Sequence, residues 1–408
     1  MKKPTFALVG VSGYGRVHYD DIMRAVAAER ADILCATVIN QAEEAERCQT
    51  LRECGCTLFD NTDDMFHEYA GRIDVCFLPV GIGLHAPLAI AAMRAGMNVF
   101  VEKPLAATIQ EADEIIATSL ETGRFVAVGY QHMYQPPVQA AKRAIIEGRI
   151  GQLQTVRGIG LWPRTNLYYA RNNWAGHLSA HGSWILDSPV NNALAHYLNL
   201  VCYLSGSAVD EMAQISMLQA GLYRANPSIE NFDTAFLKMK TEANVNLFFV
   251  TSHVTASTMN PLIEAIGETG TIRITNETCV LTTDNGTSET TLMPVMEASR
   301  DHVMDAIFAR LRDARAPVFT PLMASVVTRI VNAAHASTAI VAVPPASIDT
   351  VIGTNENEFR YVWKELDTLA NQCFEAIRMP TTDDFPFCRN GNPCRPAELK
   401  RFDGPKLD

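Results

Sequence analysis

Short apolar segments alternate with segments of helical periodicity over the first 130 residues, and this alternation constrains the fold most strongly. The helical patterns include residues 16–30, 85–96 and 109–123. Such alternation is typical of a parallel sheet covered by helices on both faces. We therefore expect an α/β protein whose residues 1–130 form a doubly wound parallel sheet, with strands in TFALVG (5–10), ILCATVI (33–39), IDVCFLPV (73–80), NVFVEKP (98–104) and RFVAVGY (124–130).

The pattern changes after residue 151, where apolar and polar residues alternate with period two. This pattern predicts a second α/β domain, residues 131–345, with a large, open and mostly antiparallel sheet. The period-two segments are 153–161, 211–219, 234–240, 245–254, 262–267, 271–275 and 279–283.

Helices interrupt and follow these strands. We expect a buried helix over 189–205 and helices across 301–342. Residues 346–408 form a C-terminal extension, with a helical segment over 359–374 and a Pro- and Asp-rich end on the surface.

The length of 408 residues suits two ordinary domains. A net charge of −11 and a pI near 5.4 argue against nucleic acid or an anionic membrane surface as a partner. No apolar run reaches the length of a bilayer span. The start, MKKPTFALVGV, is interpreted as a first strand rather than a signal peptide, because its short apolar stretch runs into Ser-Gly-Tyr-Gly.

The 10 cysteines are scattered singly, a pattern typical of reduced thiols in a cytoplasmic protein. The one close pair, Cys54 and Cys56, has no matching cysteine or histidine pair at zinc-finger spacing. We expect no metal site.

The turn after the first strand reads VGVSGYGRVH and resembles the Gly-x-Gly-x-x-Gly fingerprint of Rossmann dinucleotide-binding domains. Gly10 and Gly15 fit the first and third places, Ser12 takes the second, and Gly13 adds a flexible residue. The hydroxyl of Ser12 could itself bond a phosphate oxygen. A tight turn without a ligand is the alternative, but a place ahead of several strand–helix units favours dinucleotide binding.

Asn40 stands at the end of the second expected strand. NAD enzymes usually carry an acid there for the ribose 2′-hydroxyl, and NADP enzymes a nearby arginine. The following residues would bring Glu43 and Glu44 close to a 2′-phosphate. We predict NAD as the cofactor, with NADP as the alternative.

The stretch NVFVEKPLA ends a strand in Glu102-Lys103-Pro104, at the carboxyl edge where doubly wound sheets bind ligands. Pro104 favours an extended backbone at Lys103, which fixes the direction of its side chain. A surface lysine at a strand end is the alternative to a site residue.

The stretch DSPVNNALAHYLN, residues 187–199, opens the helix expected after its Ser-Pro pair. Asn192, His196 and Asn199 would lie within about 60° of one another on that helix. No Lys, Arg, Asp or Glu occurs from 190 to 209, so the helix is expected to be buried and its polar groups to need partners. These three polar side chains either face a ligand, which we favour, or form hydrogen bonds only within the protein core.

Taken together, these motifs resemble the glucose-fructose oxidoreductase, inositol dehydrogenase and MocA (Gfo/Idh/MocA) family. The resemblance also includes LHAPLAIAAMRAG, VAVGYQ and IEAIGETGTIRI, and it runs from about Phe6 to Val343. It implies a Rossmann domain and a second α/β domain. The implied activity is hydride transfer between a nicotinamide and a hydroxyl carbon of a sugar, cyclitol or sugar derivative.

The resemblance also implies site residues. Lys103 corresponds to the family's lysine near the reacting oxygen, and His196 to the histidine of Asp-x-x-x-His-x-x-Asp. Asn192 and Asn199 replace its two carboxylates; we predict Lys103, His196 and Asn192 as catalytic, both asparagines as substrate-binding, and Asn192→Asp as tolerated. Gly81 stands in a turn that replaces the family's Thr-Pro-Asn. The predicted cofactor contacts are Gly10, Ser12, Gly13, Tyr14, Gly15, Asn40, Gly81, His85, Glu102 and Lys103.

The segment YYARNNWAGHL, residues 168–178, has no clear counterpart in the family. Tyr169, Arg171 and Trp174 are candidates for sugar binding, because aromatic faces pack on C–H groups and guanidinium groups bond hydroxyls. An ordinary surface loop is the alternative. Gln131, which ends VAVGYQ, is also predicted to bind substrate.

Assembly is a further expectation. In VNLFFVTSHV, Phe248, Val250 and Val254 share one face of the sheet, and Leu247 and Phe249 share the other. A sheet that is apolar on both faces needs cover on both, which the family habitually obtains from a second subunit. We predict a homodimer or homotetramer.

Two other classes of function stay open. Asparagines in place of the family's carboxylates favour a nucleotide- and sugar-binding regulatory protein, which the intact Lys103 and His196 oppose. A lyase or glycosidase that oxidises its substrate transiently would keep NAD bound through purification. A sugar or polyol dehydrogenase is the hypothesis that we prefer.

Overall fold

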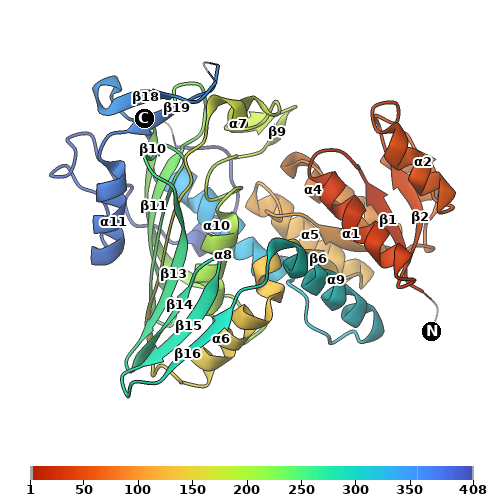
Figure 1. Cartoon of the computed structure of the whole chain (residues 1–408), viewed down its shortest axis with the longest axis horizontal. Helices are drawn as coiled ribbons and strands as arrows, with labels where there is room; N and C mark the ends of the chain where they lie inside the picture. Colours follow the sequence, from red (N-terminus) through yellow and green to blue (C-terminus); the bar gives the residue numbers. More distant parts are fainter. Residues whose placement is uncertain (1–2, 356, 407–408) are drawn as a thin grey trace. The chain divides into compact units, whose positions relative to one another are not determined.

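The computed structural model describes residues 3–355 and 357–406. The chain separates into two compact units, each shown in Figure 1. Two features differ from the expected division at 130 and 345: residues 295–325 belong to the first unit, and the C-terminal extension belongs to the second. The first unit consists of the chain up to Ala106, Gln110–Tyr134 and Val295–Ser325, and the second of Ala107–Ile109, Gln135–Pro294 and the chain from Val326 onward.

The described part of the first unit contains a six-stranded parallel sheet of order β3-β2-β1-β4-β5-β6. The strand order reverses at β1 and β4, and ligands of doubly wound sheets bind at the carboxyl ends of the strands beside that point. The expected fold of this part is confirmed, although the short β3 was not predicted. The strands are β1 (Thr5–Val9), β2 (Asp32–Thr37), β3 (Thr57–Phe59), β4 (Val75–Leu78), β5 (Asn98–Val101) and β6 (Val126–Val128).

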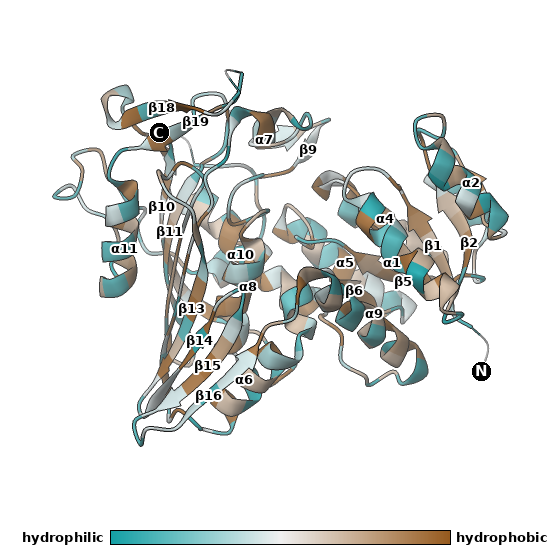
Figure 2. Ribbon diagram, viewed as in Figure 1, coloured by the Kyte–Doolittle hydropathy of each residue, from teal (hydrophilic) through white to brown (hydrophobic). Residues whose placement is uncertain are grey.

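Helices cover this sheet. In Figure 2 strand β1 is brown, whereas helix α2 is largely teal, as expected for a buried strand and a surface helix. The helices are α1 (Gly15–Ala27), α2 (Ala45–Glu53), α3 (Thr62–Glu68), α4 (His85–Arg94), α5 (Ile109–Thr122) and α9 (Met296–Arg312), with short 3₁₀ turns η1 (Ile82–Leu84) and η2 (Gln131–Tyr134).

Helix α9 belongs to the first unit because its apolar face packs into that core. Ile307 and Phe308 are buried in one cluster with Phe6 and Ile22. The rings of Phe6 and Phe308 stack with their centroids 5.8 Å apart. The return of the chain to the first unit therefore rests on hydrophobic contacts between residues some 300 positions apart, which no local pattern reveals.

The described part of the second unit contains a nine-stranded sheet of order β16-β15-β14-β13-β7-β12-β11-β10-β17. It is mixed: β7 pairs with β12 and β10 with β17 in parallel, and the other neighbours are antiparallel. The strands are β7 (Leu153–Leu161), β10 (Ile215–Arg224), β11 (Thr234–Thr241), β12 (Asn246–Ser252), β13 (Met259–Gly267), β14 (Gly270–Ile274), β15 (Thr278–Thr283), β16 (Ser288–Leu292) and β17 (Ile340–Ala342).

The other elements pack around this sheet. The end of the predicted helical region 301–342 is wrong, because Ile340–Ala342 pairs with β10 as strand β17. The remaining elements are α6 (Pro136–Ile146), α7 (Asn166–Ala170), β8 (Ser179–Ala180), β9 (Ser183–Trp184), α8 (Ala195–Leu204), α10 (Pro321–Ser337), η3 (Pro345–Ser347), β18 (Ile348–Ile352), β19 (Phe359–Trp363), α11 (Leu366–Ala376) and η4 (Pro396–Glu398).

Helix α8 begins at Ala195, six residues later than the Ser-Pro pair predicts. Side-chain hydrogen bonds hold the preceding residues in turns instead. Asn191 Nδ2 donates to the carbonyl of Leu186 at 3.2 Å, and Asn192 Nδ2 donates to Oδ1 of Asp187 at 2.8 Å. Asparagine side chains compete with helix formation through such local bonds. Asn192 therefore lies in a turn, not on the expected helical stripe.

The C-terminal extension also differs from its predicted structure. Residues 359–363 form strand β19 in a hairpin with β18, and only the part from Leu366 is helical. The backbone N–H of Trp363 donates to the carbonyl of Val254 at 2.8 Å, which ties the hairpin to the main sheet. The alternation of aromatic and β-branched residues in FRYVW fits this strand.

The extension covers one face of the nine-stranded sheet. Phe248 and Val250 on β12 lie in one buried cluster with Trp363, Leu366 and Phe374 of the extension. Helix α11 packs against β7 and β12 from this side, and α8 packs against β7, β12 and β13 (Figure 1). The chain itself therefore covers the apolar face for which a second subunit was expected, so that reason for predicting an oligomer does not hold.

Candidate active site

The glycine-rich turn has the geometry of a dinucleotide-binding loop. Gly10 and Gly13 have φ of +86° and +55°, in the left-handed region that favours glycine. A Cβ on Gly15 would lie 2.7 Å from the carbonyl oxygen of Gly10, so the start of α1 approaches the end of β1 too closely for any side chain. The N–H of Gly10 donates to Thr37 O at 2.8 Å. Strand, turn and helix thus meet as the fingerprint requires.

The first turn of α1 is open to an anion. Ser12, Gly13 and Tyr14 are exposed, and no side chain caps the helix at Tyr14. Exposed N–H groups and the positive end of the helix dipole favour a phosphate group at such a position. The residues present therefore fit the pyrophosphate of a dinucleotide.

Asn40 lies beside this turn, as predicted. Its Nδ2 donates to Ser12 Oγ at 3.0 Å and to Glu43 Oε2 at 3.0 Å. Asn40 thus joins the glycine turn to an acidic side chain after β2. This set offers hydrogen bonds to a ribose hydroxyl, and the Glu43 carboxylate would repel a 2′-phosphate.

His85 links two loops at the edge of the sheet. Its Nδ1 lies 2.7 Å from the carbonyl oxygen of Pro104 and its Nε2 lies 3.1 Å from that of Val80. Burial lowers the pKa of His85 in spite of these two carbonyl contacts. Because both ring nitrogens already contact backbone carbonyls, His85 positions the loop that follows Lys103. The predicted cofactor contact of His85 stays a prediction. Gly81, in the turn before α4, stays a predicted backbone contact.

Glu102 orients the backbone at Lys103. Its carboxylate, 6% exposed, accepts the backbone N–H of Lys103 at 3.1 Å and lies 3.0 Å from His18 Nε2 on α1. Burial would raise the pKa of Glu102, but the hydrogen bond and charge of His18, together with Lys103, lower it on balance. A Cβ on Gly129 would lie 2.8 Å from this carboxylate, which explains the glycine of VAVGYQ. The predicted cofactor contact of Glu102 stays a prediction.

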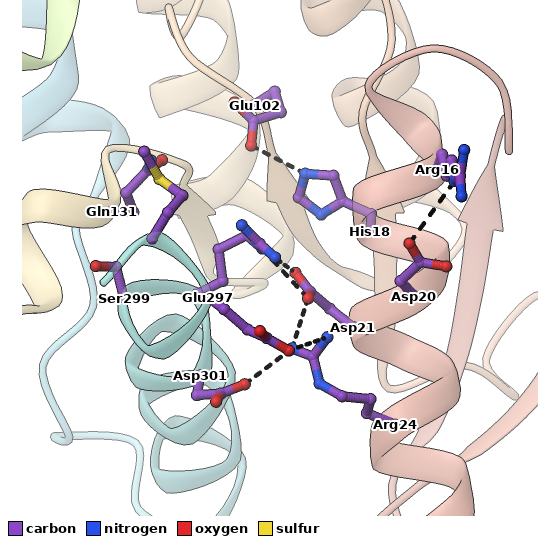
Figure 3. A network of polar contacts seen from close by, with 12 residues as sticks. Arg16, His18, Asp20, Asp21, Arg24, Glu102, Gln131, Glu297, Ser299 and Asp301 are labelled. Atoms are coloured by element: carbon purple, nitrogen blue, oxygen red, sulfur yellow. Dashed lines mark hydrogen bonds and ion pairs between the residues drawn. The ribbon is translucent and has the colours of Figure 1, made fainter. Parts of the chain in front are cut away.

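A polar network joins α1 to α9 near these residues (Figure 3). Asp21 accepts from Arg24 at 2.7 Å and from Arg300 at 3.0 Å. Gln131, also drawn there, is buried and its Nε2 donates to the sulfur of Met296 at 3.0 Å. This side chain contacts α9 from inside the unit. The predicted contact of Gln131 with substrate stays a prediction.

In the second unit, a carboxylate that the sequence analysis missed lies next to Asn192. Asp187 is 3% exposed; its Oδ1 accepts from Asn192 and its Oδ2 accepts the N–H of Gly176 at 2.7 Å. Asn192 and His196 are themselves partly exposed, as site residues must be. Asp187 is the first residue of the stretch that drew attention to this helix, five positions before Asn192.

Asn199 occupies a different environment from Asn192. It is 0% exposed, and neither Oδ1 nor Nδ2 has a hydrogen-bond partner among the residues that the structure describes. The predicted substrate contact of Asn199 stays a prediction. Only Asn192 of the two asparagines lies at an accessible position.

The loop 168–178 gathers aromatic and cationic groups around α7. The guanidinium carbon of Arg171 lies 3.6 Å from the ring centroid of Tyr168 and 5.4 Å from that of Trp174. Arg164, which no sequence motif singled out, lies 4.7 Å from the same Tyr168 ring. The hydroxyl of Tyr169 is buried without a hydrogen-bond partner among the described residues. The expected sugar-binding group thus forms one cluster, to which Arg164 and Tyr168 must be added.

Comparison with known proteins agrees with both units. The description "Oxidoreductase family, NAD-binding Rossmann fold" matches residues 5–130, and "GFO/IDH/MocA C-terminal domain" matches residues 138–273. The chain belongs to the Gfo/Idh/MocA oxidoreductase family. The resemblance seen in the sequence is therefore confirmed, and the first unit of this family member is its NAD-binding Rossmann domain.

Individual relatives are distant. The inositol 2-dehydrogenase of Azotobacter vinelandii is 26% identical over 198 residues, which are 48% of this chain and 53% of that protein. The chain thus matches about half the length of this curated relative. Among solved structures, a levoglucosan dehydrogenase in complex with NADH and levoglucosan has a TM-score of 0.68 at 16% identity, covering 81% of this chain and 96% of that one. The WlbA dehydrogenase of Bordetella pertussis, in complex with NADH and UDP-GlcNAcA, has a TM-score of 0.65 at 23% identity, covering 81% and 95%. Both structural likenesses show the fold.

Other classes of site find no support within the described residues. They contain no group of His, Cys, Asp or Glu that could hold a metal ion, and none of their helices is long and apolar enough to cross a membrane. All ten cysteines, each of them described, are free thiols.

Proposed function

We propose that this protein is a dehydrogenase that transfers hydride between NAD and a hydroxyl carbon of a sugar, cyclitol or sugar derivative. The observation that carries the proposal is the pairing of a complete glycine-turn geometry with a lysine whose backbone Glu102 holds at the carboxyl edge of the same sheet. The names of the relatives, inositol 2-dehydrogenase and levoglucosan dehydrogenase, agree with this reaction class.

Each residue has a distinct role in this proposal. The start of α1 and Ser12 bind the pyrophosphate, and Asn40 bonds a ribose hydroxyl. The nicotinamide, when bound, supplies the hydride acceptor or donor. The Lys103 ammonium polarises the substrate oxygen, and the imidazole of His196 takes the hydroxyl proton during oxidation. Asn192 offers its amide to a substrate hydroxyl while Asp187 orients it.

Different observations bear on the two alternative functions, a regulatory protein and a lyase or glycosidase. The regulatory alternative rested on the loss of carboxylates from the histidine helix, and Asp187 restores one beside Asn192. The lyase or glycosidase alternative requires cofactor that never leaves the protein. Whether NAD survives purification is therefore the observation that separates it from a dehydrogenase.

The test is a substrate screen on the purified protein. NAD and NADP are each supplied with a panel of polyols, cyclitols, sugars and sugar acids, and NADH formation is followed by its absorbance. Denatured protein is assayed in parallel for released nucleotide. We expect NADH formation with at least one panel member and no retained cofactor. Normal NADH binding without turnover on any compound would support the regulatory alternative, and retained NAD with a product that is not oxidised would support the lyase.

Location and assembly belong to the same proposal. The free thiols agree with a cytoplasmic protein, and the net charge of −11 agrees with a small-molecule rather than a nucleic-acid partner. A homo-oligomer, if formed, would use an edge of the sheet rather than the covered face. Strand β16 is the end strand of its sheet and all five of its residues are exposed. Light scattering at micromolar concentration, with Thr290→Pro to block strand pairing, tests this assembly.

A further inference from the structure

Two arginines share one tyrosine ring in the second unit. The guanidinium carbons of Arg171 and Arg164 lie 3.6 and 4.7 Å from the ring centroid of Tyr168. Arg164 also lies over Trp162, at 5.5 Å, and Trp162 packs edge-on against Tyr197 of α8, at 5.9 Å. Ring contacts through Trp162 thus link Arg164 to helix α8, which carries His196.

Neither arginine forms an ion pair with any residue that the structure describes. Other arginines of this unit do: Arg157 lies 2.8 Å from Glu264, and Arg378 lies 2.6 Å from Asp384. Two guanidinium groups on one ring repel each other unless an anion lies close to both. The cluster therefore lacks the negative charge that would balance it.

Nearby carboxylates are already engaged. Asp187 accepts hydrogen bonds from Asn192 and from the backbone of Gly176. Asp233 accepts the backbone N–H groups of Ala225 and Asn226, and burial raises its pKa to about 7. Neither aspartate is within ion-pair distance of the two arginines, so the residues that the structure describes supply no counter-charge at close range.

Two buried polar atoms near the arginines lack hydrogen-bond partners within the described residues. The Nε of Arg164 and the hydroxyl of Tyr169 are buried and have no hydrogen-bond partner among the described residues. Buried polar groups are normally hydrogen-bonded, and an orphaned donor on a cation is especially costly. The adjacent His253 adds no further positive charge, because burial, and then the charge of Arg164, lower its pKa to about 3 and leave the ring neutral.

We propose that the substrate carries an anionic group, a carboxylate or a phosphoryl group, and that Arg164 and Arg171 bind it. This inference rests on the proposed function and narrows its substrate class to sugar acids or sugar phosphates. Guanidinium groups bind both anions through paired hydrogen bonds. The Tyr168 ring packs against both arginines, and its neighbour in sequence, Tyr169, carries a buried hydroxyl that has no hydrogen-bond partner among the described residues.

The test measures binding directly, so that it does not depend on turnover. Calorimetric titrations in the presence of NADH compare glucose with glucuronate and glucose 6-phosphate, galactose with galacturonate and galactose 6-phosphate, and inositol with inositol phosphate. We expect at least one anion to bind tenfold or more tightly than its neutral partner, because hydrogen bonds to charged groups are the stronger ones. Comparing the sugar acids with the sugar phosphates shows whether the site prefers a carboxylate or a phosphoryl group.

Variants connect that binding to the two residues. Arg164→Gln and Arg171→Gln should each weaken binding of the preferred anion about tenfold or more and leave its neutral partner unchanged. Arg395→Gln is the matched control, since Arg395 is an exposed arginine of the same unit whose ion pair with Glu398 lies at the surface. The NADH affinity of each variant, together with its thermal unfolding, confirms that it is folded.

Three outcomes overturn the inference: neutral sugars that bind as tightly as their anionic partners, anions that all fail to bind at millimolar concentration, or full anion affinity in both arginine variants. Failure of the proposed function looks different. Anion binding that depends on both arginines, without NADH formation from any bound compound, would reject the dehydrogenase and keep the anion site.

Discussion

The Nδ2 of Asn192 donates a hydrogen bond to Oδ1 of Asp187 across 2.8 Å, in the turn that leads into the histidine helix. The family motif places a carboxylate at the position of Asn192. In this chain the carboxylate stands five residues earlier and reaches the same turn through a hydrogen bond. A carboxylate is therefore present in the same turn as the asparagine, on a different residue.

This relationship reverses the expectation for Asn192→Asp. A second carboxylate would face Asp187 at hydrogen-bond distance, and the two negative charges would repel each other. We expect a loss of about 1–3 kcal/mol in the free energy of unfolding at pH 8. Like-charge repulsion raises the pKa of one of these carboxyls in the folded state. The folded state then binds the extra proton, so the loss should shrink as the pH falls through that pKa.

The double variant Asp187→Asn with Asn192→Asp is the control, because it exchanges the two groups and restores one hydrogen bond. We expect it to recover most of the stability. Urea unfolding at pH 8 and pH 5 measures all three proteins. An Asn192→Asp variant as stable as the wild type at both pH values contradicts the predicted repulsion.

Lys103→Met and His196→Ala should each lower turnover on the true substrate roughly 100-fold or more, the usual contribution of a positioned acid or base. Neither residue lies at the glycine turn, so the affinity for NADH should hardly change. Steady-state kinetics and fluorescence titration with NADH separate these effects. Turnover that survives His196→Ala, or loss of NADH binding in both variants, would show that these residues have another role.

The NAD preference should depend on Glu43. NAD should bind more tightly than NADP, since Asn40 is bonded to Glu43 where a 2′-phosphate would need positive charge. Glu43→Gln should improve NADP binding by roughly fivefold to tenfold, with little effect on NAD. Glu53→Gln, at the end of the helix α2 that follows Glu43, is a suitable control. Fluorescence titrations of both nucleotides decide the matter, and tighter NADP binding by the wild type would contradict the prediction.

Trp363 should stabilise the second unit strongly. It is fully buried between the main sheet and the extension, so Trp363→Ala should cost about 3–5 kcal/mol. Val351→Ala, at a half-exposed position of the adjacent strand β18, should cost far less. Chemical unfolding compares the two variants. Similar losses in both would mean that the extension does not complete the core.

Lys142 predicts a pH dependence. Its ammonium is buried at the end of α8, where Nζ donates to the carbonyls of Tyr203 and Gly206 at 2.6 and 2.5 Å. Burial lowers the pKa of Lys142 to about 7, although the charge of Glu211 opposes the shift. The unfolded chain then binds more protons than the folded one between about pH 7 and the ordinary lysine pKa, so stability gains a contribution as the pH rises through that range.

Replacement by an apolar side chain should remove that contribution. The difference in stability between wild type and Lys142→Met should therefore move in favour of the wild type from pH 7 to pH 10. Thermal unfolding at several pH values measures it. A difference that does not vary with pH would mean that Lys142 keeps its ordinary pKa.

The sequence alone determined the features that depend on neighbours along the chain. The alternation of strands and helices, the glycine-rich turn after the first strand, and the place of Lys103 at the end of a strand are local properties, and each was predicted. Backbone conformation and side-chain periodicity repeat over a few residues, which is why they can be read without a structure.

Only the tertiary structure decided which distant groups meet. Asn192 bonds Asp187 in a turn ahead of the helix, and residues of the C-terminal extension cover the sheet face for which a second subunit was expected. Arg164 joined Arg171 because both pack on Tyr168. Such contacts depend on how the whole chain folds. The interaction energy of each pair is gained only after packing has brought the two residues together, so no local sequence pattern predicts them.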